Sequence, residues 1–333
     1  MAERAGEVSV YATCPQSKDV PREEYVARVS EVARWSEAAG CDGILVYTDN
    51  GLVDPWLVSQ LILQSTERLS PLVAIQPVYM HPYTAATMIA SLAFLHGRPV
   101  ALNMLAGGFR NDLVALGDET PHDERYARTV EYTQIVTGLL AGESVTLEGR
   151  YYRVRNLSLA PPVPQALRPP VLISGSSPAG LEAARALGAT AVRYPKPPGE
   201  EDDALEDRSI EYGVRVGVIA RESAEEAWRV ALERFPEDRK GQITHSLAMQ
   251  VSDSHWHRQL SEAADARAGD SPYWLGPFKN YKTFCPYLVG THERVAEEVA
   301  AYAARGFTTV ILDVPPSEEE LRHTGIVLRA AAT

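Results

Sequence analysis

Cysteine is scarce in this chain of 333 residues, and long apolar runs are absent. The three cysteines, Cys14, Cys41 and Cys285, lie far apart and in no spacing typical of a metal site. Such sparse thiols are typical of proteins in a reducing compartment. No apolar stretch approaches the ~18 residues that a membrane span needs, and the charged start MAERAGEVSV is unlike a signal peptide. We therefore expect a cytoplasmic protein without a membrane segment.

Runs of basic residues are also missing, and the formal net charge at pH 7 is -12. A nucleic-acid-binding surface needs a patch of Lys and Arg to contact phosphates, so no nucleic-acid partner is expected. The sequence has no GxGxxG after a strand, no GxSxG and no cluster of carboxylates and histidines at strand ends. The HxH of His255 and His257 lies away from the strand ends, so no metal site is predicted.

Apolar segments alternate along the chain with segments whose apolar residues recur at helical spacing. Strands that are apolar throughout and alternate with amphipathic helices indicate a parallel sheet covered on both faces. Eight such units close into a barrel and do not form an open sheet. We predict an α/β fold, a single (β/α)8 TIM barrel over residues 1–333, with strands over 7–14, 41–49, 71–77, 98–105, 170–175, 189–193, 211–220 and 307–314.

Two segments interrupt this alternation. Residues 144–157 read SVTLEGRYYRVRNL and predict a β-hairpin that turns at Glu148 and Gly149. Residues 236–290 form an insertion before the last strand, polar at first and then rich in aromatic residues. A long aromatic insertion at a barrel rim is typical of a lid or substrate wall. Aromatic residues are also enriched at subunit contacts, so both roles stay open for this segment.

Amides, hydroxyls and tyrosines dominate the carboxyl ends of the predicted strands, where the active sites of such barrels lie. Asn103 interrupts the apolar run VALNML, and a buried amide without partners costs ~1–3 kcal/mol. The small residues Ala106, Gly107 and Gly108 follow, and they allow backbone to approach a ligand closely. The stretch fits one rim of a ligand pocket, and it also fits a strained turn followed by a solvated loop.

A second candidate pocket segment is SGSSP, residues 174–178, which runs from a strand into the start of a helix. Serine hydroxyls, backbone N–H groups and the helix dipole together form an anion site that suits a phosphate. The same residues suit an ordinary serine N-cap. A barrel mouth rich in hydrogen-bonding groups but poor in acids and bases is typical of an enzyme whose cofactor carries the chemistry. We favour a phosphorylated planar cofactor.

Several segments, in family order, resemble the bacterial luciferase-like flavin-dependent monooxygenase superfamily and, within it, the alkanesulfonate monooxygenase-like branch. They span nearly the whole chain and include AAGCDGILVYTD, LHGRPVALNMLAGG, HDERYARTVEYTQIVTGLL, PPVLISGSSPAG, YGVRVGVIARESAEEAW and YLVGTHERVAEEVAAYAARGF. The resemblance implies a luciferase-like barrel with an insertion before the last strand. It implies reduced FMN as cofactor, a separate NAD(P)H-dependent flavin reductase as partner, and a homodimer or homotetramer.

The resemblance also implies roles for individual residues. Asn103 matches a contact to the flavin ring, and Tyr126, Ser176 and Ser177 match contacts to the phosphate. The full set of predicted cofactor-binding residues is Tyr47, Thr48, Gln76, Asn103, Ala106, His122, Tyr126, Gly175, Ser176 and Ser177. The polar residues predicted to assist catalysis are Asn103, Arg215, Tyr194 and Lys282, and Arg215 matches an arginine of the family pattern.

Three departures from the family pattern concern the substrate. Leu52 stands where the alkanesulfonate enzymes carry a cysteine, Gly217 where they carry a histidine, and Val314 where they carry a tyrosine. A sulfonate needs fixed cations and donors. We therefore predict an FMN-dependent two-component monooxygenase that oxygenates a different small organic compound, in specialised metabolism. One alternative is an F420-dependent hydride-transfer oxidoreductase, and the other is a flavin-binding homologue without turnover.

Overall fold

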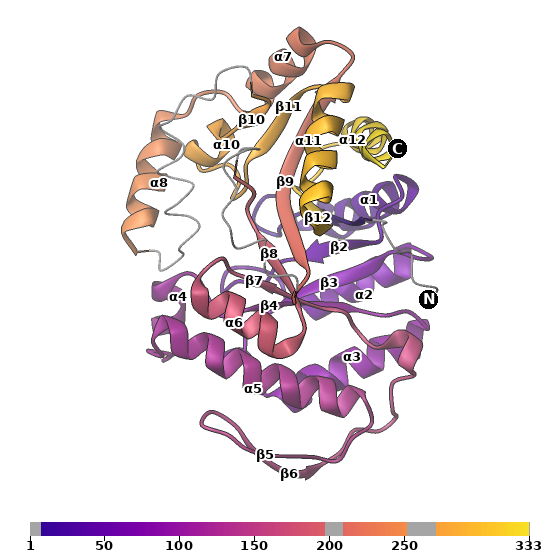
Figure 1. Ribbon diagram of the computed structural model, residues 1–333, viewed down its shortest axis with the longest axis vertical. Coiled ribbons are helices and arrows are strands. Elements are labelled where there is room, and N and C mark those ends of the chain that lie inside the picture. The colour runs from indigo at the N-terminus through magenta and orange to yellow at the C-terminus, as the bar shows by residue number, and fades with distance from the viewer. Residues whose placement is uncertain (1–7, 197–208, 252–270, 333) are drawn as a thin grey trace.

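Parallel strands occupy the centre of the molecule (Figure 1). Their pairings close them into a ring. A computed structural model describes residues 8–196, 209–251 and 271–332. The strands of the ring are β1 (Ser9–Thr13), β2 (Gly43–Val46), β3 (Ser70–Ile75), β4 (Ala101–Leu105), β7 (Val171–Ser174), β8 (Thr190–Arg193), β9 (Tyr212–Arg221) and β12 (Phe307–Leu312). Each pairs in parallel with the next, and the pairing of β12 with both β9 and β1 closes the ring. The predicted (β/α)8 barrel is confirmed.

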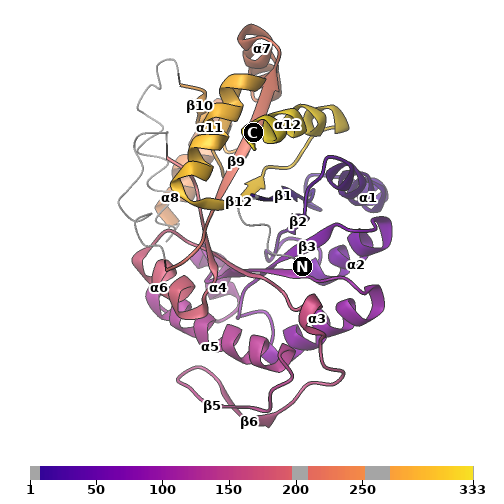
Figure 2. The same cartoon turned by 45° about the vertical axis from the view of Figure 1, so that its right-hand side comes forward.

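Helices pack around the outside of this barrel, as Figures 1 and 2 show. Helix α2 illustrates how the sequence sets their start: the Asp54 side chain accepts hydrogen bonds from the backbone N–H groups of Trp56 and Leu57, and Pro55 occupies the first turn. No helix in the described ranges is both long and apolar enough to cross a membrane. The outer helices are α1 (Arg22–Ala38), α2 (Pro55–Ser65), α3 (Pro82–His96), α5 (His122–Leu140), α6 (Pro178–Leu187), α11 (His292–Arg305) and α12 (Glu318–Ala331).

Strand β9 extends beyond the barrel and starts a second, smaller sheet. Its first half pairs with β12, whereas residues 217–221 pair in parallel with β11 (Tyr287–Thr291). A short strand, β10 (Tyr273–Trp274), pairs antiparallel with β11. Helix α7 (Ala224–Arg234) packs on β9 and β11 and lies at the top of Figure 1. The chain therefore leaves the barrel at Gly217, one of the positions where it departs from the alkanesulfonate pattern.

The insertion over 236–290 precedes β12, as predicted, and it contains regular structure that the sequence analysis did not assign. In the described part of the insertion, the elements are α8 (Arg239–Val251), β10, α10 (Gly276–Lys279) and β11. Strand β11 was missed because the short apolar run YLV does not itself show which sheet it joins; the extension of β9 provides the partner. Residues 252–270, with the HxH pair, lie outside the described residues. The lid role of the insertion stays a prediction.

The predicted hairpin is confirmed as β5 (Val145–Glu148) and β6 (Arg153–Leu157), which pair antiparallel. Figure 1 shows it on the outside of the molecule, beyond α5. The Glu131 carboxylate of α5 accepts hydrogen bonds from the backbone N–H groups of Arg150, Tyr151 and Tyr152, at 2.8, 2.9 and 3.0 Å. These bonds fasten the turn of the hairpin to the helix layer.

Candidate functional site

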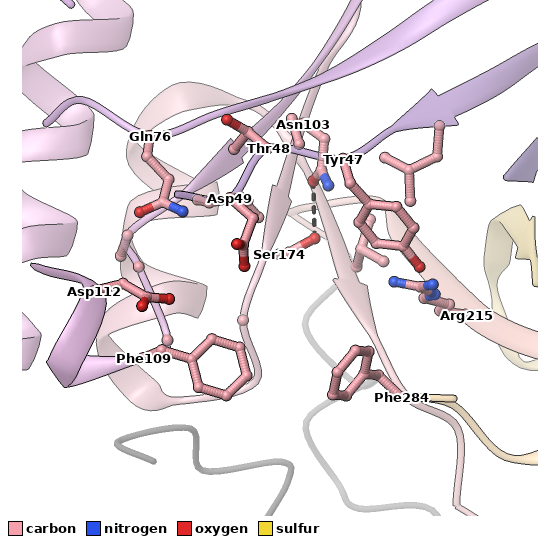
Figure 3. Close-up of a pocket in the computed structure, with 18 of the residues that line it drawn as sticks. Tyr47, Thr48, Asp49, Gln76, Asn103, Phe109, Asp112, Ser174, Arg215 and Phe284 are labelled. Carbon is pink, nitrogen blue, oxygen red and sulfur yellow. Dashed lines mark hydrogen bonds between the residues drawn. The ribbon is translucent and has the colours of Figure 1, made fainter. Parts of the chain in front are cut away.

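A cavity opens at the carboxyl ends of the barrel strands (Figure 3). Side chains from several strands, among them Leu45, Ala74 and Ile311, form an apolar part of its wall. Most of the sequence-predicted residues line it: Tyr47, Thr48, Gln76, Asn103, Ala106, His122, Tyr126, Gly175, Ser176, Ser177, Tyr194 and Arg215. The structure thus brings them to one place, while their individual roles in binding or catalysis stay predictions.

Asn103 on β4 is only 4% exposed, and its side chain faces the cavity. The neighbouring strand β7 ends at Ser174, whose hydroxyl donates to Asn103 Oδ1 at 2.8 Å (dashed in Figure 3). This bond occupies the amide oxygen and fixes the orientation of the amide. The amide N–H₂ group lines the cavity as a donor, which suits a carbonyl or ring-nitrogen acceptor.

The start of helix α6 forms a corner of the cavity that is rich in hydrogen-bond donors. Ser177 is the N-cap, and its hydroxyl oxygen accepts from the backbone N–H of Gly180 at 3.1 Å. The Tyr126 hydroxyl hydrogen-bonds Ser177 and also reaches the carbonyl of Ser174 at 3.4 Å. Burial raises the pKa of Tyr126, so its hydroxyl stays protonated and can donate. The buried Ser176 hydroxyl has no hydrogen-bond partner within the described chain.

Gly175 explains how backbone and hydroxyls come so close in this corner. A Cβ atom at this position would collide with the Tyr126 hydroxyl, so only glycine fits. The corner therefore offers the N-terminus of a ten-residue helix, a serine hydroxyl to which no described residue bonds, and a neutral tyrosine. These are the donors that a phosphate needs. The amide of Asn103, which is hydrogen-bonded to the neighbouring Ser174, lines the same cavity, and the residues present fit a flavin mononucleotide.

Arg215 on β9 provides a buried positive charge in the cavity wall. The residue is 8% exposed, and its guanidinium carbon lies 5.0 Å from the centre of the Tyr47 ring. Its Nη2 atom is 3.7 Å from Asp313 Oδ1, and neither Nε nor Nη2 has a hydrogen-bond partner among the described residues. A buried guanidinium whose donors lack hydrogen bonds lowers the stability of the fold. These donors are therefore suited to bind an acceptor on a ligand in the cavity.

Asp313, which the sequence analysis missed, anchors this side of the site. Its Oδ2 atom accepts hydrogen bonds from the hydroxyls of Thr283, at 2.5 Å, and Tyr287, at 2.8 Å. Burial raises the pKa of Tyr287 well above its ordinary value, and the Asp313 charge adds to the effect. The Tyr287 ring lies against Gly217, where a Cβ atom would collide with it. The space beside the histidine position of the alkanesulfonate enzymes is thus filled by a tyrosine ring.

The outer part of the cavity carries carboxylates and aromatic rings. Asp49 follows β2, and Asp112 lies on the short helix α4 (Arg110–Ala115). Phe109 and Phe284 face each other edge to face, with ring centres 6.4 Å apart (Figure 3). The sequence signal for Asp49 was its place at the polar carboxyl end of the strand predicted over 41–49. No sequence signal pointed to Asp112, whose place in the wall depends on the position of α4 at the mouth.

Other predicted or family-pattern positions fall at the edge of the site or outside it. His122 begins α5, its Nδ1 atom lies 2.7 Å from Asp123 Oδ1, and its ring packs on Tyr126 with centres 5.3 Å apart. Leu52 lines the mouth, so the side chain at the family's cysteine position is apolar. Lys282 does not line the cavity, and its ammonium pairs with Asp238 at 2.7 Å on the insertion. The prediction that Lys282 assists catalysis therefore has no support from its position.

Comparison with known proteins agrees with the fold. Residues 7–309 match the protein family described as "Luciferase-like monooxygenase". The chain is 36% identical over 310 residues to the 4-(gamma-L-glutamylamino)butanoyl-[BtrI acyl-carrier protein] monooxygenase BtrO of Niallia circulans, which covers 91% of this chain and 90% of BtrO.

Two solved structures share the fold at low sequence identity. EDTA monooxygenase EmoA from Chelativorans sp. BNC1 superposes with a TM-score of 0.76 and 16% identity, over 97% of this chain and 93% of that chain. The oxygenating constituent of 3,6-diketocamphane monooxygenase from Pseudomonas putida, in complex with FMN, superposes with a TM-score of 0.68 and 16% identity, over 97% of each chain. The match over most of the sequence and the identity to BtrO place the chain in the luciferase-like monooxygenase family, as a monooxygenase of the flavin-dependent type.

Proposed function

We propose that this chain is the oxygenase component of a two-component system. It takes reduced FMN from a separate NAD(P)H-dependent reductase and uses O2 to oxygenate a small organic substrate. The observation that carries the proposal is a pair of donor groups on one cavity. One is the Ser176 hydroxyl at the α6 N-terminus, which has no hydrogen-bond partner among the described residues, and the other is the fixed amide of Asn103. They suit the phosphate and the ring of one nucleotide.

The chemistry divides between the cofactor and the protein. Reduced FMN, when bound, would supply the two electrons with which O2 gives one oxygen atom to the substrate and one to water. Ser176, Ser177 and Tyr126 hold the phosphate, and Asn103 orients the ring. The hydrogen-bond donors of Arg215 stabilise negative charge that develops on oxygen beside the Tyr47 ring.

Two further groups of the site have roles in this proposal. Tyr194 is buried, which raises its pKa well above the ordinary value, so its hydroxyl stays protonated during the reaction. The rings of Phe109 and Phe284 narrow the mouth and limit the entry of water. Exclusion of water matters for a monooxygenase because water competes with the substrate for activated oxygen.

For the substrate, we propose an acyl group that a carrier protein presents. The support is the identity to BtrO, whose name places its substrate on an acyl-carrier protein. An alkanesulfonate is disfavoured, because Leu52 is apolar and the Tyr287 ring fills the space beside Gly217. We also propose a homodimer or homotetramer, in which the outer face of α3 forms the contact surface.

An anaerobic titration of tryptophan fluorescence with reduced FMN and, separately, reduced F420 tests the cofactor. We expect quenching by reduced FMN at micromolar concentration and none by reduced F420 in the same range. Preference for F420 would replace oxygenation by hydride transfer. Binding of neither would rule out the two-component proposal. A reaction under ¹⁸O₂ then tests turnover, because a monooxygenase leaves one labelled oxygen atom in the product and a hydride-transfer enzyme leaves none.

A further inference from the structure

The carboxylates of Asp49 and Asp112 lie at the cavity mouth, and the contacts of the described residues do not explain why both are there. Asp49 Oδ1 accepts a hydrogen bond from the backbone N–H of Gly51 at 2.9 Å, as in an ordinary turn. Across residues 8–196, 209–251 and 271–332, neither Asp49 nor Asp112 forms an ion pair. Burial raises the pKa of Asp112, and the charge of Asp49 raises it further. Two like charges therefore face the same space, and no basic group of the described residues forms an ion pair with either of them.

Hydrogen bonds of the Asn50 side chain connect the segment after Asp49 to α4 and to Tyr79. These bonds do not involve the carboxylates of Asp49 and Asp112. The Asn50 amide donates to the backbone carbonyl of Asp112 at 3.0 Å, and its Oδ1 atom accepts from the Tyr79 hydroxyl at 2.6 Å. Burial and then the charges of Asp49 and Asp112 raise the pKa of Tyr79 to about 12, so this hydroxyl remains a donor. The two carboxylates are thus fixed in place beside the mouth before any ligand binds.

Aromatic rings complete the wall next to the carboxylates. Phe109 immediately precedes α4, which carries Asp112, and its ring packs against Phe284. Phe284 in turn packs against Tyr281 at 5.7 Å and 86°. Carboxylates beside aromatic rings favour an organic cation, since the ring faces attract positive charge and the carboxylates accept its hydrogen bonds. A divalent metal ion would need about six oxygen ligands, which two carboxylates do not supply.

The charges on the cavity wall are separated. Asp49 and Asp112 lie on one side of the view in Figure 3, and Arg215 lies on the other side with Tyr47. Lys18 also lines the mouth, but its side chain is exposed to solvent. Arg215 is more than nine-tenths buried and has unmade hydrogen bonds. A substrate that satisfies both sides carries a cation at one end and an oxygen-rich group at the other.

We infer that Asp49 and Asp112 bind an alkylammonium group of the substrate, and that this enzyme acts on amine-bearing acyl compounds. The oxygen-bearing end of the substrate then lies toward Arg215. This inference rests on the proposed monooxygenase function and specifies its substrate class. It makes Asp49 and Asp112 residues that determine specificity, with no part in holding the flavin.

Small probes test the inference without knowledge of the natural substrate. Binding of hexylammonium and of 1-hexanol is titrated by saturation-transfer NMR at constant ionic strength, with the full-length protein. The probes have the same chain length and differ in charge. We expect the protein to bind hexylammonium about 10- to 100-fold more tightly than 1-hexanol, the range that charge-assisted hydrogen bonds provide. Equal affinity for the two probes would overturn the inference.

Variants identify the residues responsible. The double substitution Asp49→Asn/Asp112→Asn keeps side-chain size and should abolish the preference, and Asp112→Asn alone should reduce it. Asp19→Asn serves as the control, because Asp19 is an exposed carboxylate that does not line the cavity. It should leave the preference unchanged. A preference that persists in the double variant, with the fold intact by circular dichroism, would exclude these carboxylates as the cation site.

The reduced-FMN titration, carried out on the same samples, separates the two proposals. If the unmodified protein binds reduced FMN but shows no preference for hexylammonium over 1-hexanol, only the proposed substrate class is overturned. Absence of FMN binding, with the ammonium preference present, would overturn the proposed cofactor and leave the cation site standing.

Discussion

Asn103 lies in the apolar strand β4, and its side chain bonds to Ser174 on the neighbouring strand β7 and lines the cavity. Its oxygen is occupied by Ser174, so its N–H₂ group is the part available to a flavin. We expect Asn103→Ala to weaken the binding of reduced FMN by ~1–3 kcal/mol through loss of hydrogen bonds to the ring. The measurement is the anaerobic fluorescence titration. Asn111→Ala, an exposed amide on α4 outside the cavity lining, is the control. An unchanged dissociation constant in Asn103→Ala would remove this residue from the flavin site.

Gly217 and Gly290 lie on paired strands, but their surroundings differ. A Cβ atom at Gly217 would collide with the Tyr287 ring, whereas one at Gly290 would have its nearest neighbour at 3.6 Å. We expect Gly217→Ala to lower the free energy of unfolding by ~1–3 kcal/mol because the ring must move. Gly290→Ala should change it by no more than about 0.5 kcal/mol. Urea unfolding measures both. Equal effects would mean that the Tyr287 ring does not block the family's histidine position.

Helix α6 tests whether an N-cap also binds phosphate. Ser177 caps α6 at the cavity, and Ser223 caps α7 away from it, by the same kind of hydrogen bond. Each Ser→Ala change should cost ~1 kcal/mol of stability through loss of the cap. Only Ser177→Ala should also weaken FMN, by roughly 10-fold, and it should leave riboflavin nearly unaffected because riboflavin lacks the phosphate. Calorimetric titration of both ligands measures this. Equal losses for FMN and riboflavin would contradict a phosphate site.

Helix α1 is fastened to the chain entering β3 by one carboxylate. Glu37 Oε1 accepts from the backbone N–H groups of Glu67, Arg68 and Leu69. Burial acts to raise the pKa of Glu37, but these three hydrogen bonds outweigh it and hold the pKa below its usual 4.5. Because the folded pKa is the lower one, the stabilisation is complete above pH 4.5 and is lost as the pH falls through the folded value.

We therefore expect Glu37→Gln to lower the free energy of unfolding near neutral pH by ~1–3 kcal/mol. The difference from the unmodified protein should shrink as the pH falls below 4.5. Urea unfolding over a pH series measures it. Glu233→Gln removes an exposed carboxylate that pairs with Arg229 on the surface, and it should have an effect below about 0.5 kcal/mol at every pH. A Glu37→Gln effect that does not depend on pH would contradict the assignment.

At the scale of the whole molecule, the barrel was predictable because its strands are buried on both faces and read as apolar runs. The bounds were less predictable where a strand enters the site. The strand predicted over 41–49 ends at Val46 in the structure, and Tyr47, Thr48 and Asp49 turn into the cavity wall. Their side chains continue the sequence pattern, but the backbone leaves the sheet. The cavity itself could be located from the sequence because the apolar runs of the strands change to polar residues at their carboxyl ends.

Contacts between distant segments were not predictable from local pattern. Asp313 acquires its place from Thr283 and Tyr287, which the insertion brings to the end of β12. The proximity of Asp49 to Asp112 depends on the path of α4 over the barrel mouth. Lys282 was predicted near the site, but it pairs with Asp238, which the sequence pattern did not indicate. In each case a side-chain pair across segments decides the outcome.

The outer face of α3 carries a last prediction, about assembly. The helix reads PYTAATMIASLAFLH and has no Asp, Glu, Lys or Arg. Tyr83, Met88, Phe94 and Leu95 are exposed on it, with Phe94 at 74%, and Figure 2 shows the helix on the outside of the barrel. An exposed apolar face without charges is typical of a surface that another subunit covers. We therefore expect a second copy of the chain to pack here.

Light scattering coupled to size-exclusion chromatography tests this assembly. The unmodified chain should elute as a dimer or tetramer, and Phe94→Arg should shift it toward the 36.5 kDa monomer, because burying an unpaired guanidinium opposes association. Leu232→Arg makes a similar change at an exposed leucine on the charged helix α7, and it should leave the mass unchanged. A monomeric unmodified protein, or a Phe94→Arg variant that keeps the full assembly, would show that α3 is not the interface.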